Sequence, residues 1–303
     1  MYAVSICIPT YKRPELIERL ITSIGSCNLD PALIGKILIV VVDNDADRSA
    51  AAKVAELSTR LAGKITIDYH SYAIKGLASV RNELIRQAFK NKPDFIVFVD
   101  DDEYVCTDWL NALVKTIINN NADMVMGPVT AVFEHQTPEH ITTWFARGRH
   151  PDNARLDYIR TGNLIINAAF LSRLNIWFDE RFNKTGSEDT YFGNEMIKKG
   201  ASIYWAAQAK VYEITPPSRT NIRWLFNRRY RVANTFTYML KIDKLHAQVF
   251  KKALVSIVYL ILGAATAVFA IIPFRKRNWG LLKIAEGAGG LSALFDIAFN
   301  EYH

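Results

Sequence analysis

Two clusters of acidic residues are the side chains in this sequence whose types and spacing could do chemistry. Residues 100–103 read DDDE and directly follow an apolar run at 95–99, and residues 188–189 read ED within the stretch GSED. Carboxylates this close raise one another's pKa unless a cation intervenes. Hard divalent ions such as Mg²⁺ and Mn²⁺ prefer oxygen ligands, and one or two carboxylates together with phosphate oxygens suffice to hold them. The first cluster is therefore a candidate site for a divalent cation.

Each cluster also has a simpler interpretation. A solvated loop tolerates several acids after a strand, and acids in the first turn of a helix are favoured by the helix dipole without any function. The position of these side chains in the fold distinguishes the two interpretations. A functional site requires them at the ligand-binding edge of the sheet.

The first hundred residues alternate between apolar strands and amphipathic helices. The expected strands are 3–10, 36–43, 64–70 and 95–99, and the expected helices are 14–23, 49–61 and 77–89. The continuous apolar run at 36–43 is typical of a parallel strand covered on both faces. This order predicts an α/β protein with a Rossmann-like, doubly wound, mostly parallel sheet.

Polar residues follow three of these four strands. The first strand runs into Pro9–Arg13, the second into Asp43–Asp45 and the fourth into the DDDE cluster. Ligands of such sheets bind beyond the carboxyl ends of the strands, so these groups are expected to converge. The glycine-rich phosphate loops G-x-G-x-x-G and G-x-x-x-x-G-K-[ST] are absent from the sequence. A nucleotide at this edge would need a metal ion on the carboxylates to neutralise its diphosphate.

Beyond residue 106 the pattern changes. The expected strands are 122–133, 161–167 and 201–214, and the expected helices are 107–119, 168–174 and one that begins at Ser187 and ends before Gly200. Residues 220–242 read as an amphipathic helix. Its apolar side comprises Ile222, Leu225, Phe226, Ala233, Phe236 and Leu240.

The net charge of +7 is concentrated near the C-terminus. Residues 219–252 hold nine Lys or Arg and one acid, Asp243, whereas the first 218 residues sum to −2. A nucleic-acid-binding protein would more often spread its basic charge over the folded domain. The basic block directly precedes an uncharged apolar segment at 253–274, which is long enough to cross a bilayer. This placement favours a membrane surface, with a buried core helix as the alternative.

The remaining features narrow the class of protein. A weaker apolar stretch at 279–299 could be the return arm of a hairpin or an interfacial helix. The three cysteines show no paired spacing, which favours a reducing compartment over a disulfide framework. The N-terminus lacks the basic leader and long apolar run of a signal peptide.

Six motifs together resemble a known family. SICIPTYKRPELI, VVDND, GLASVRN, FVDDDEYV, GNLIIN and GSEDTYF look like the successive motifs of family-2 inverting glycosyltransferases, over residues 3 to about 240. The resemblance implies a GT-A fold and transfer of one sugar from a nucleotide-diphosphate sugar, most often a UDP-sugar, with Mn²⁺ or Mg²⁺ as cofactor. The C-terminal part, with TPPSRTNIRW and a hydrophobic tail, resembles bacterial members that build exopolysaccharide or surface glycans. These relatives imply a glycan or polyprenyl-diphosphate-linked acceptor, a membrane lipid contact and a location at the cytoplasmic face of the inner membrane.

The resemblance also implies roles for individual residues. The D-x-D frame falls on Asp100 and Asp102, which implies metal binding, with Asp101 as the variable middle residue. The E-D pair falls on Glu188 and Asp189, and Asp189 is the first choice for the catalytic base. The nucleotide-sugar contacts implied by the motifs are Pro9, Thr10, Tyr11, Arg13, Asp43 (to the base), Arg81, Asp100 and Asp101. Asp101 and Glu103 are expected to matter less than Asp100 and Asp102.

Two departures from the family pattern affect the expected site. Glu213 stands where many relatives have a histidine, so it is the candidate third metal ligand. Processive synthases carry Q-x-x-R-W, whereas here Thr220 replaces the glutamine, which favours single-sugar transfer. The candidate acceptor or lipid contacts are Arg219, Arg223, Trp224 and Arg228. A merely solvated basic helix explains these four equally well.

The expected organisation has four parts. Residues 1–105 form a nucleotide-sugar-binding half, 106–218 an acceptor-binding and catalytic half, 219–252 a basic interfacial helix and 253–303 a membrane-anchoring tail. The competing hypotheses are a non-catalytic, membrane-tethered nucleotide-sugar-binding assembly subunit and a sugar nucleotidyltransferase. The second is disfavoured because PTYKRP lacks the glycine-rich loop of such enzymes.

Overall fold

The computed structural model describes residues 1–146, 148–268, 274–297 and 299. It contains two compact units. The first unit comprises Met1–Val132, Arg147–Asn183 and Glu188–Ile214, and the second comprises Phe133–Ala146, Lys184–Ser187 and Thr215–His303.

The first unit is built on an eight-stranded sheet in the order β3-β2-β1-β4-β9-β6-β10-β8. Strands β1 to β4 are mutually parallel, whereas β9 runs antiparallel to both β4 and β6. The strands are β1 (Tyr2–Thr10), β2 (Ile34–Asp43), β3 (Thr66–Ser71), β4 (Phe95–Val99), β6 (Met124–Met126), β8 (Arg155–Leu156), β9 (Asn163–Asn167) and β10 (Ile203–Trp205). A second, three-stranded sheet has the order β5-β11-β7. Its strands are β5 (Glu103–Val105), β7 (Val129–Phe133) and β11 (Val211–Thr215).

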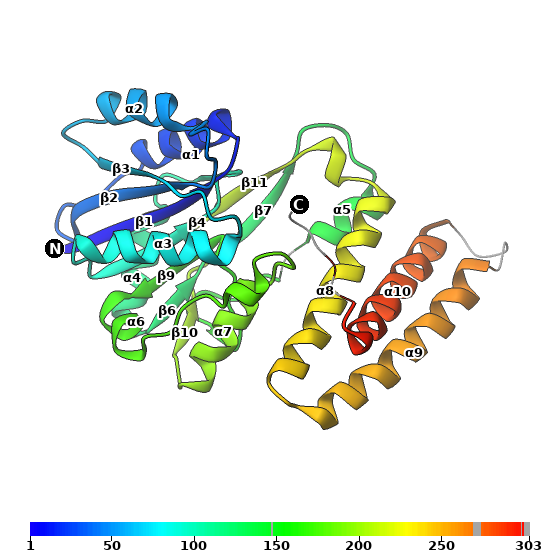
Figure 1. Cartoon of the computed structure of the whole chain (residues 1–303). Coiled ribbons are helices and arrows are strands. Elements are labelled where there is room, and N and C mark those ends of the chain that lie inside the picture. Colours follow the sequence, from blue (N-terminus) through cyan, green and yellow to red (C-terminus); the bar gives the residue numbers. More distant parts are fainter. Residues whose placement is uncertain (147, 269–273, 298, 300–303) are drawn as a thin grey trace. The chain divides into compact units, whose positions relative to one another are not determined.

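Helices cover both faces of the large sheet (Figure 1). One buried cluster joins alternate strand residues to α1 (Pro14–Gly25), α2 (Ala51–Arg60) and α4 (Trp109–Asn119). The other joins the intervening strand residues to α3 (Leu77–Lys90), α6 (Ala168–Leu174) and α7 (Glu188–Lys198). This arrangement explains the unbroken apolar run in β2, because side chains on both of its faces are buried.

The expected α/β fold with a mostly parallel central sheet is confirmed. Strands β2 and β3 lie on one side of β1 and strand β4 lies on the other. The topological switch point is therefore between β1 and β4, where Thr10 and Val99 end their strands. The register pairs Thr10 with Asp43, which brings two of the polar strand ends side by side.

Two expected strands were wrong in the same way. The region 122–133 contains β6 and β7, and the region 201–214 contains β10 and β11. In each case the first strand belongs to the large sheet and the second to the small sheet. The chain changes sheets at Gly127 and near Ala209, where a Cβ on Gly127 would overlap the Ala209 carbonyl oxygen. Hydrophobic patterning alone does not mark such a change.

The second unit is mainly helical. Its elements are α5 (Glu139–Thr142), η1 (Thr143–Phe145), η3 (Pro217–Arg219), α8 (Ile222–Ile242), α9 (His246–Val268), α10 (Phe274–Ser292) and η4 (Ala293–Phe295). Helix α10 packs against both α8 and α9. The apolar helix expected at 253–274 begins earlier, at His246, and residues 269–273 lie outside the described residues.

Helix α9 is the one described helix long and apolar enough to cross a membrane, over His246–Thr266. Only 11% of its apolar stretch is buried. This low burial argues against the alternative of a core helix.

Candidate active site

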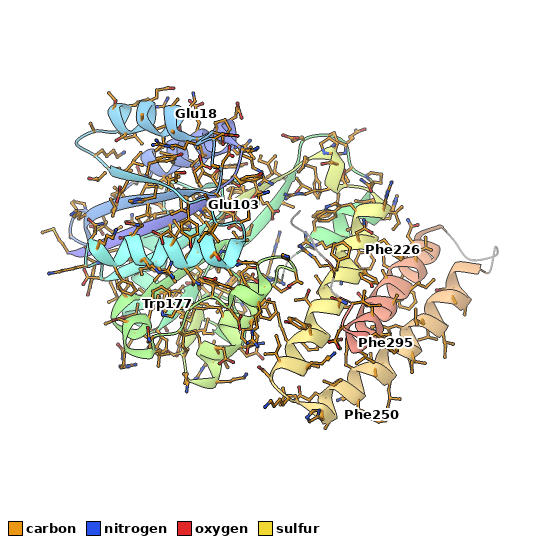
Figure 2. The ribbon with its side chains drawn as sticks, in the orientation of Figure 1. Glu18, Glu103, Trp177, Phe226, Phe250 and Phe295 are labelled. Carbon is orange, nitrogen blue, oxygen red and sulfur yellow. The ribbon has the colours of Figure 1, made fainter. Side chains whose placement is uncertain are left out.

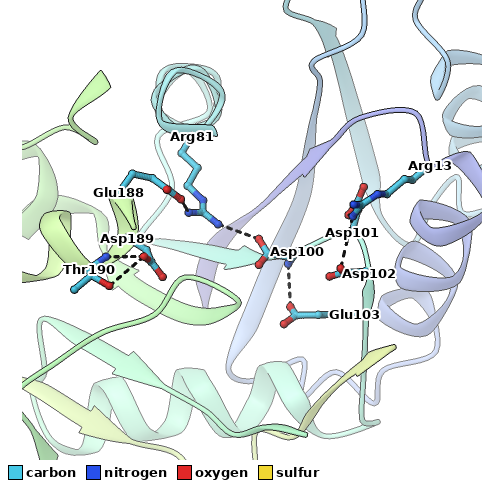
Figure 3. A network of polar contacts seen from close by, with 9 residues as sticks. All are labelled: Arg13, Arg81, Asp100, Asp101, Asp102, Glu103, Glu188, Asp189 and Thr190. Atoms are coloured by element: carbon cyan, nitrogen blue, oxygen red, sulfur yellow. Dashed lines mark hydrogen bonds and ion pairs between the residues drawn. The ribbon is translucent and has the colours of Figure 1, made fainter. Parts of the chain in front are cut away.

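Asp101 lies inward at the carboxyl end of β4, and the rest of the acid cluster is arranged around it (Figure 3). It is 6% exposed and accepts hydrogen bonds from the Thr10 hydroxyl at 2.9 Å and from Arg13 Nη1 at 3.1 Å. Burial raises the pKa of Asp101 to about 6, although the Arg13 guanidinium opposes this shift. Asp101 thus links the ends of β1 and β4 across the switch point.

Asp100 and Asp102 are the more accessible members of the cluster. Their side chains are 36% and 15% exposed, and Asp102 Oδ2 lies 3.6 Å from Arg13 Nη1. Within the described part of the chain, no three His, Cys, Asp or Glu side chains are grouped closely enough to hold a metal ion by themselves. Two accessible carboxylates fit a different arrangement, in which one ion is shared between the protein and substrate phosphates.

Glu103 is buried beneath this pair. Its side chain accepts a hydrogen bond from the Asp100 backbone N–H at 2.9 Å, and it is 2% exposed. Burial raises the pKa of Glu103 well above its usual range, and the nearby Asp100 and Glu213 carboxylates add to the effect. Glu213 is the direct cross-strand partner of Glu103 in the β5–β11 pair. A Cβ on Gly162 would lie 2.7 Å from Glu103 Oε1, so the carboxyl group packs directly on the backbone before β9.

Arg81 on α3 joins the two acid clusters that are far apart in sequence. Its side chain is 3% exposed, and it pairs with Asp100 through Nη2 at 3.1 Å and with Glu188 through Nη1. The guanidinium also lies over the Phe178 ring, 5.7 Å from its centroid. The structure therefore joins Asp100 and Glu188 through Arg81 in one polar network, whereas Asp189 is bonded to Thr190, as Figure 3 shows.

Glu188 and Asp189 begin α7 but have different surroundings. Glu188 is 3% exposed, and burial raises its pKa to about 7 against the opposing charge of Arg81. Asp189 is partly exposed and accepts hydrogen bonds from the Thr190 backbone N–H at 2.7 Å and from the Thr190 hydroxyl at 3.3 Å. Asp189 is therefore the more accessible member of the pair.

Asp43 is fully buried at the end of β2. One carboxylate oxygen accepts from the Asp45 N–H at 3.0 Å, and the other accepts from the Ala50 N–H and the Tyr69 hydroxyl, both at 2.9 Å. Burial and this hydrogen bond raise the pKa of Tyr69 to about 12. These three internal bonds fix the loop after β2, and the expected contact to the base remains a prediction.

The other nucleotide-contact candidates differ in exposure. Pro9 and Thr10 are buried in β1, whereas Tyr11 is 44% exposed and the Arg13 side chain is 42% exposed. Lys12 lies over the Tyr11 ring at 5.5 Å. Side chains that can reach a ligand therefore follow β1 immediately.

The four candidate acceptor or lipid contacts all lie in the second unit. Trp224 stacks on Phe145 with ring centroids 5.7 Å apart, and the Arg228 guanidinium lies over the Trp224 ring, 5.0 Å from its centroid. Arg219 ends η3, and Arg223 is exposed on α8. Trp224 thus has an evident packing role within its own unit.

Two residues that position the site were not foreseen. Asn163 at the start of β9 is 2% exposed and accepts from Trp109 Nε1 at 2.8 Å. Its amide donates to the Pro128 and Ala209 carbonyls, at the two places where the chain changes sheets. Tyr69 fixes Asp43 as described above. The signal for Asn163 was an amide at the head of an otherwise apolar strand, whereas nothing in the sequence pairs Tyr69 with Asp43.

The sheet with its switch-point acids and the E-D pair on α7 define a glycosyltransferase of the GT-A fold. The chain belongs to glycosyl transferase family 2, whose family model matches residues 5–177. It is 30% identical over 299 residues to the succinoglycan biosynthesis protein ExoM of Rhizobium meliloti (strain 1021), covering 97% of this chain and 93% of that protein. The expected membership of a family of bacterial surface-glycan enzymes is confirmed.

Two solved structures show the same fold. Residues 1–349 of Staphylococcus aureus TarS, in complex with UDP-GlcNAc, match with a TM-score of 0.56 at 15% identity, covering 97% of this chain and 92% of that one. The mannosyltransferase PcManGT from Pyrobaculum calidifontis, in complex with GDP-Man and Mn²⁺, matches with a TM-score of 0.63 at 17% identity, covering 97% and 87%.

Proposed function

We propose that this glycosyltransferase transfers a single sugar, with inversion, from a UDP-sugar to a hydroxyl of a glycan or polyprenyl-diphosphate-linked acceptor. The observation that carries the proposal is the Arg81 bridge, because it ties Asp100 to Glu188, which directly precedes Asp189 at the start of α7. The proposed transfer uses two carboxylate functions, one at the leaving group and one at the acceptor hydroxyl. The bridge supports an assignment in which the Asp100 cluster serves the first and Asp189 the second.

The leaving-group side of the site is formed by Asp100 and Asp102. A Mn²⁺ or Mg²⁺ ion held by these carboxylates would act as a Lewis acid on the diphosphate. Arg13 and Arg81 already lie against the acids, so they can contribute positive charge at the same place. Thr10, through Asp101, keeps the loop in position for this task.

The acceptor side of the site is assigned to Asp189. A sugar hydroxyl is a poor nucleophile, so a carboxylate must remove its proton in the transition state. Asp189 is accessible, whereas Glu188 is buried against Arg81, so Glu188 positions the start of α7 and Asp189 acts as the base. Attack on the face opposite the leaving group inverts the anomeric carbon.

The donor and the location follow from the relatives and the tail. The TarS structure holds UDP-GlcNAc, and the relative ExoM is a succinoglycan biosynthesis protein, which supports a UDP-sugar donor and an exopolysaccharide product. The apolar helix α9 supports a place at the cytoplasmic face of the inner membrane. There Arg219, Arg223 and Arg228 would contact acceptor pyrophosphate or anionic lipid.

The test separates donor binding from turnover. Thermal stabilisation by UDP-sugars is expected to require Mn²⁺ or Mg²⁺, because a ligand that binds the folded state raises its stability. Asp102→Ala should lose both this stabilisation and UDP release, whereas Asp189→Asn should keep the stabilisation and lose turnover. Asp68→Asn, an exposed change on the edge strand β3, is the matched control and should behave as wild type. Turnover that survives both active-site changes overturns the proposal.

The alternative is a non-catalytic, membrane-tethered assembly subunit that binds nucleotide sugars. It predicts divalent-dependent UDP-sugar binding with no turnover on any lipid-linked acceptor. Asp189 is accessible and directly follows Glu188, which is buried against Arg81. This accessible carboxylate favours the enzyme over the assembly subunit.

A further inference from the structure

Helices α8 and α9 bury several polar side chains. Asn234, Thr235 and Thr237 on α8 and Ser256 on α9 are at most 1% exposed. The Asn234 amide donates to Ser292 Oγ at the end of α10, at 2.8 Å. The interior of this helical unit is thus partly polar.

Charged groups of α10 are also turned inward. The Glu286 side chain is 14% exposed and pairs with Arg229 of α8 at 3.1 Å and with Lys283 at 2.6 Å. Lys283 in turn lies over the ring of Tyr259 on α9, 4.1 Å from its centroid. Water-soluble helices usually show the reverse pattern, with charges outside and apolar residues inside.

The outer surface of α9 is largely apolar from Phe250 to Leu262, with the exposed Lys251 near its start. Its exposed residues recur at the spacing of a single helix face, with Phe250 at one end (Figure 2). This apolar face comprises Phe250 (66% exposed), Leu254 (50%), Ile257 (45%), Val258 (49%), Ile261 (63%) and Leu262 (47%). It extends about 18 Å along the helix axis. A contiguous apolar surface of this kind marks an interaction site, whereas scattered single residues do not.

Small residues make the closest backbone contacts between α9 and α10. A Cβ on Gly263 would lie 2.7 Å from the Gly280 carbonyl oxygen, and a Cβ on Gly287 would lie 2.6 Å from the Ser256 carbonyl oxygen. The two backbones therefore touch, as in helix pairs that associate in lipid. These contacts also set residues 280–287 of α10 level with residues 256–263 of α9.

We propose that the apolar face of α9 lies in the acyl–headgroup boundary of one anionic membrane leaflet, with the helix along the surface and not across the bilayer. A spanning α9 would carry Lys283 and Glu286, which lie level with its middle, into the hydrocarbon core at high cost. Exposed Lys244 and Lys251 near the start of α9 match anionic headgroups. The inference rests on the membrane location proposed above and identifies the surface that contacts the membrane.

The experiment is vesicle flotation of the full-length protein, without donor or acceptor. We expect binding to phosphatidylcholine vesicles that contain phosphatidylglycerol, weaker binding to phosphatidylcholine alone, and release at alkaline pH in carbonate. Ile257→Gln/Ile261→Gln should weaken binding by at least about tenfold, because two side chains leave the apolar boundary. Ile74→Gln, an exposed apolar residue of the first unit, is the control and should bind as wild type.

Several outcomes overturn the inference. Flotation of the folded Ile257→Gln/Ile261→Gln variant at the wild-type level would overturn it. Wild-type binding that resists carbonate would also overturn it, because such resistance indicates a spanning helix. A third outcome would show that a second copy of the chain covers the apolar face. In that case the wild type does not float and forms a dimer without lipid, and the double variant is a monomer. Thermal unfolding checks that the Ile257→Gln/Ile261→Gln variant is folded. If that variant is unfolded, the variant Leu254→Gln/Val258→Gln takes its place in the experiment. Because flotation needs no sugar chemistry, intact binding without turnover contradicts only the proposed function.

Discussion

The buried Glu188 makes stability depend on pH in a direction that can be measured. Two effects compete at this carboxyl group: burial favours the protonated form, and the Arg81 guanidinium favours the ionised form. Burial is the larger effect, so the pKa rises from 4.5 to about 7 in the folded protein. Between these two values the folded state binds more protons than the unfolded state. Stability therefore falls as pH rises through this window.

The magnitude follows from the same shift. Each pKa unit corresponds to about 1.4 kcal/mol, so the full effect on the free energy of unfolding is about 3 kcal/mol. Because Glu188 is 3% exposed, solvent screening reduces this value little. The loss is complete above about pH 7 and absent below about pH 4.5.

The assay compares urea unfolding of wild type and Glu188→Gln between pH 4.5 and 8. Glutamine keeps the shape and a hydrogen bond to Arg81 but cannot titrate. The difference in free energy, wild type minus variant, should decline with rising pH and level off above about pH 7. Glu195→Gln changes a partly exposed member of an ion pair on the same helix and should give a flat difference curve. A flat or rising curve for Glu188→Gln would refute the reasoning, because it would mean that Arg81 holds the carboxylate ionised.

Three further changes test how the site is held. Asp101→Asn should destabilise the protein by about 2 kcal/mol, because it weakens buried bonds to Thr10 and Arg13, whereas Asp102→Asn should cost under about 1 kcal/mol in urea unfolding. Asn163→Ala should cost about 3 kcal/mol by the same measurement, because it removes the partner of the buried Trp109 N–H and of the Ala209 carbonyl, whereas the Pro128 carbonyl still accepts from the Val211 N–H; Asn120→Ala, at a partly exposed helix end, should cost far less. Tyr69→Phe should cost about 1 kcal/mol, since two backbone N–H groups still hold Asp43, and a loss above about 3 kcal/mol would contradict that.

The parallel half of the sheet was predictable because each strand is an unbroken apolar run that ends in polar residues. Burial on both faces of β2 requires such a run, and the switch point then places Thr10 beside Asp43. The second half was less predictable. Strands β6 and β10 leave the large sheet after three residues each, and what allows this is a tertiary contact between Gly127 and Ala209. Asn163 completes the crossing by donating its amide N–H groups to the Pro128 and Ala209 carbonyls, and no local pattern encodes that.

The sequence indicated which residues form the E-D pair but not how they divide the work. Both acids open the same helix, and helix-dipole arguments treat them alike. The difference arises from Arg81, which approaches from α3 and buries Glu188 while Asp189 stays accessible. The proposed role of Asp189 as the base therefore rests on a contact between residues more than a hundred positions apart.

The crowded acids after β4 divide into two accessible and two buried side chains. Asp100 and Asp102 are partly exposed, whereas Asp101 and Glu103 are buried. The four acids form a turn between β4 and β5, in which the Glu103 N–H donates to the Asp100 carbonyl at 3.2 Å, and this turn leaves the two carboxylates of the D-x-D frame accessible. The two buried ones bond to Thr10, Arg13 and the Asp100 N–H, so they hold the loop against the sheet. The expectation that Asp101 and Glu103 matter less thus applies to substrate contact alone, because without these buried acids the accessible pair would lose its fixed geometry.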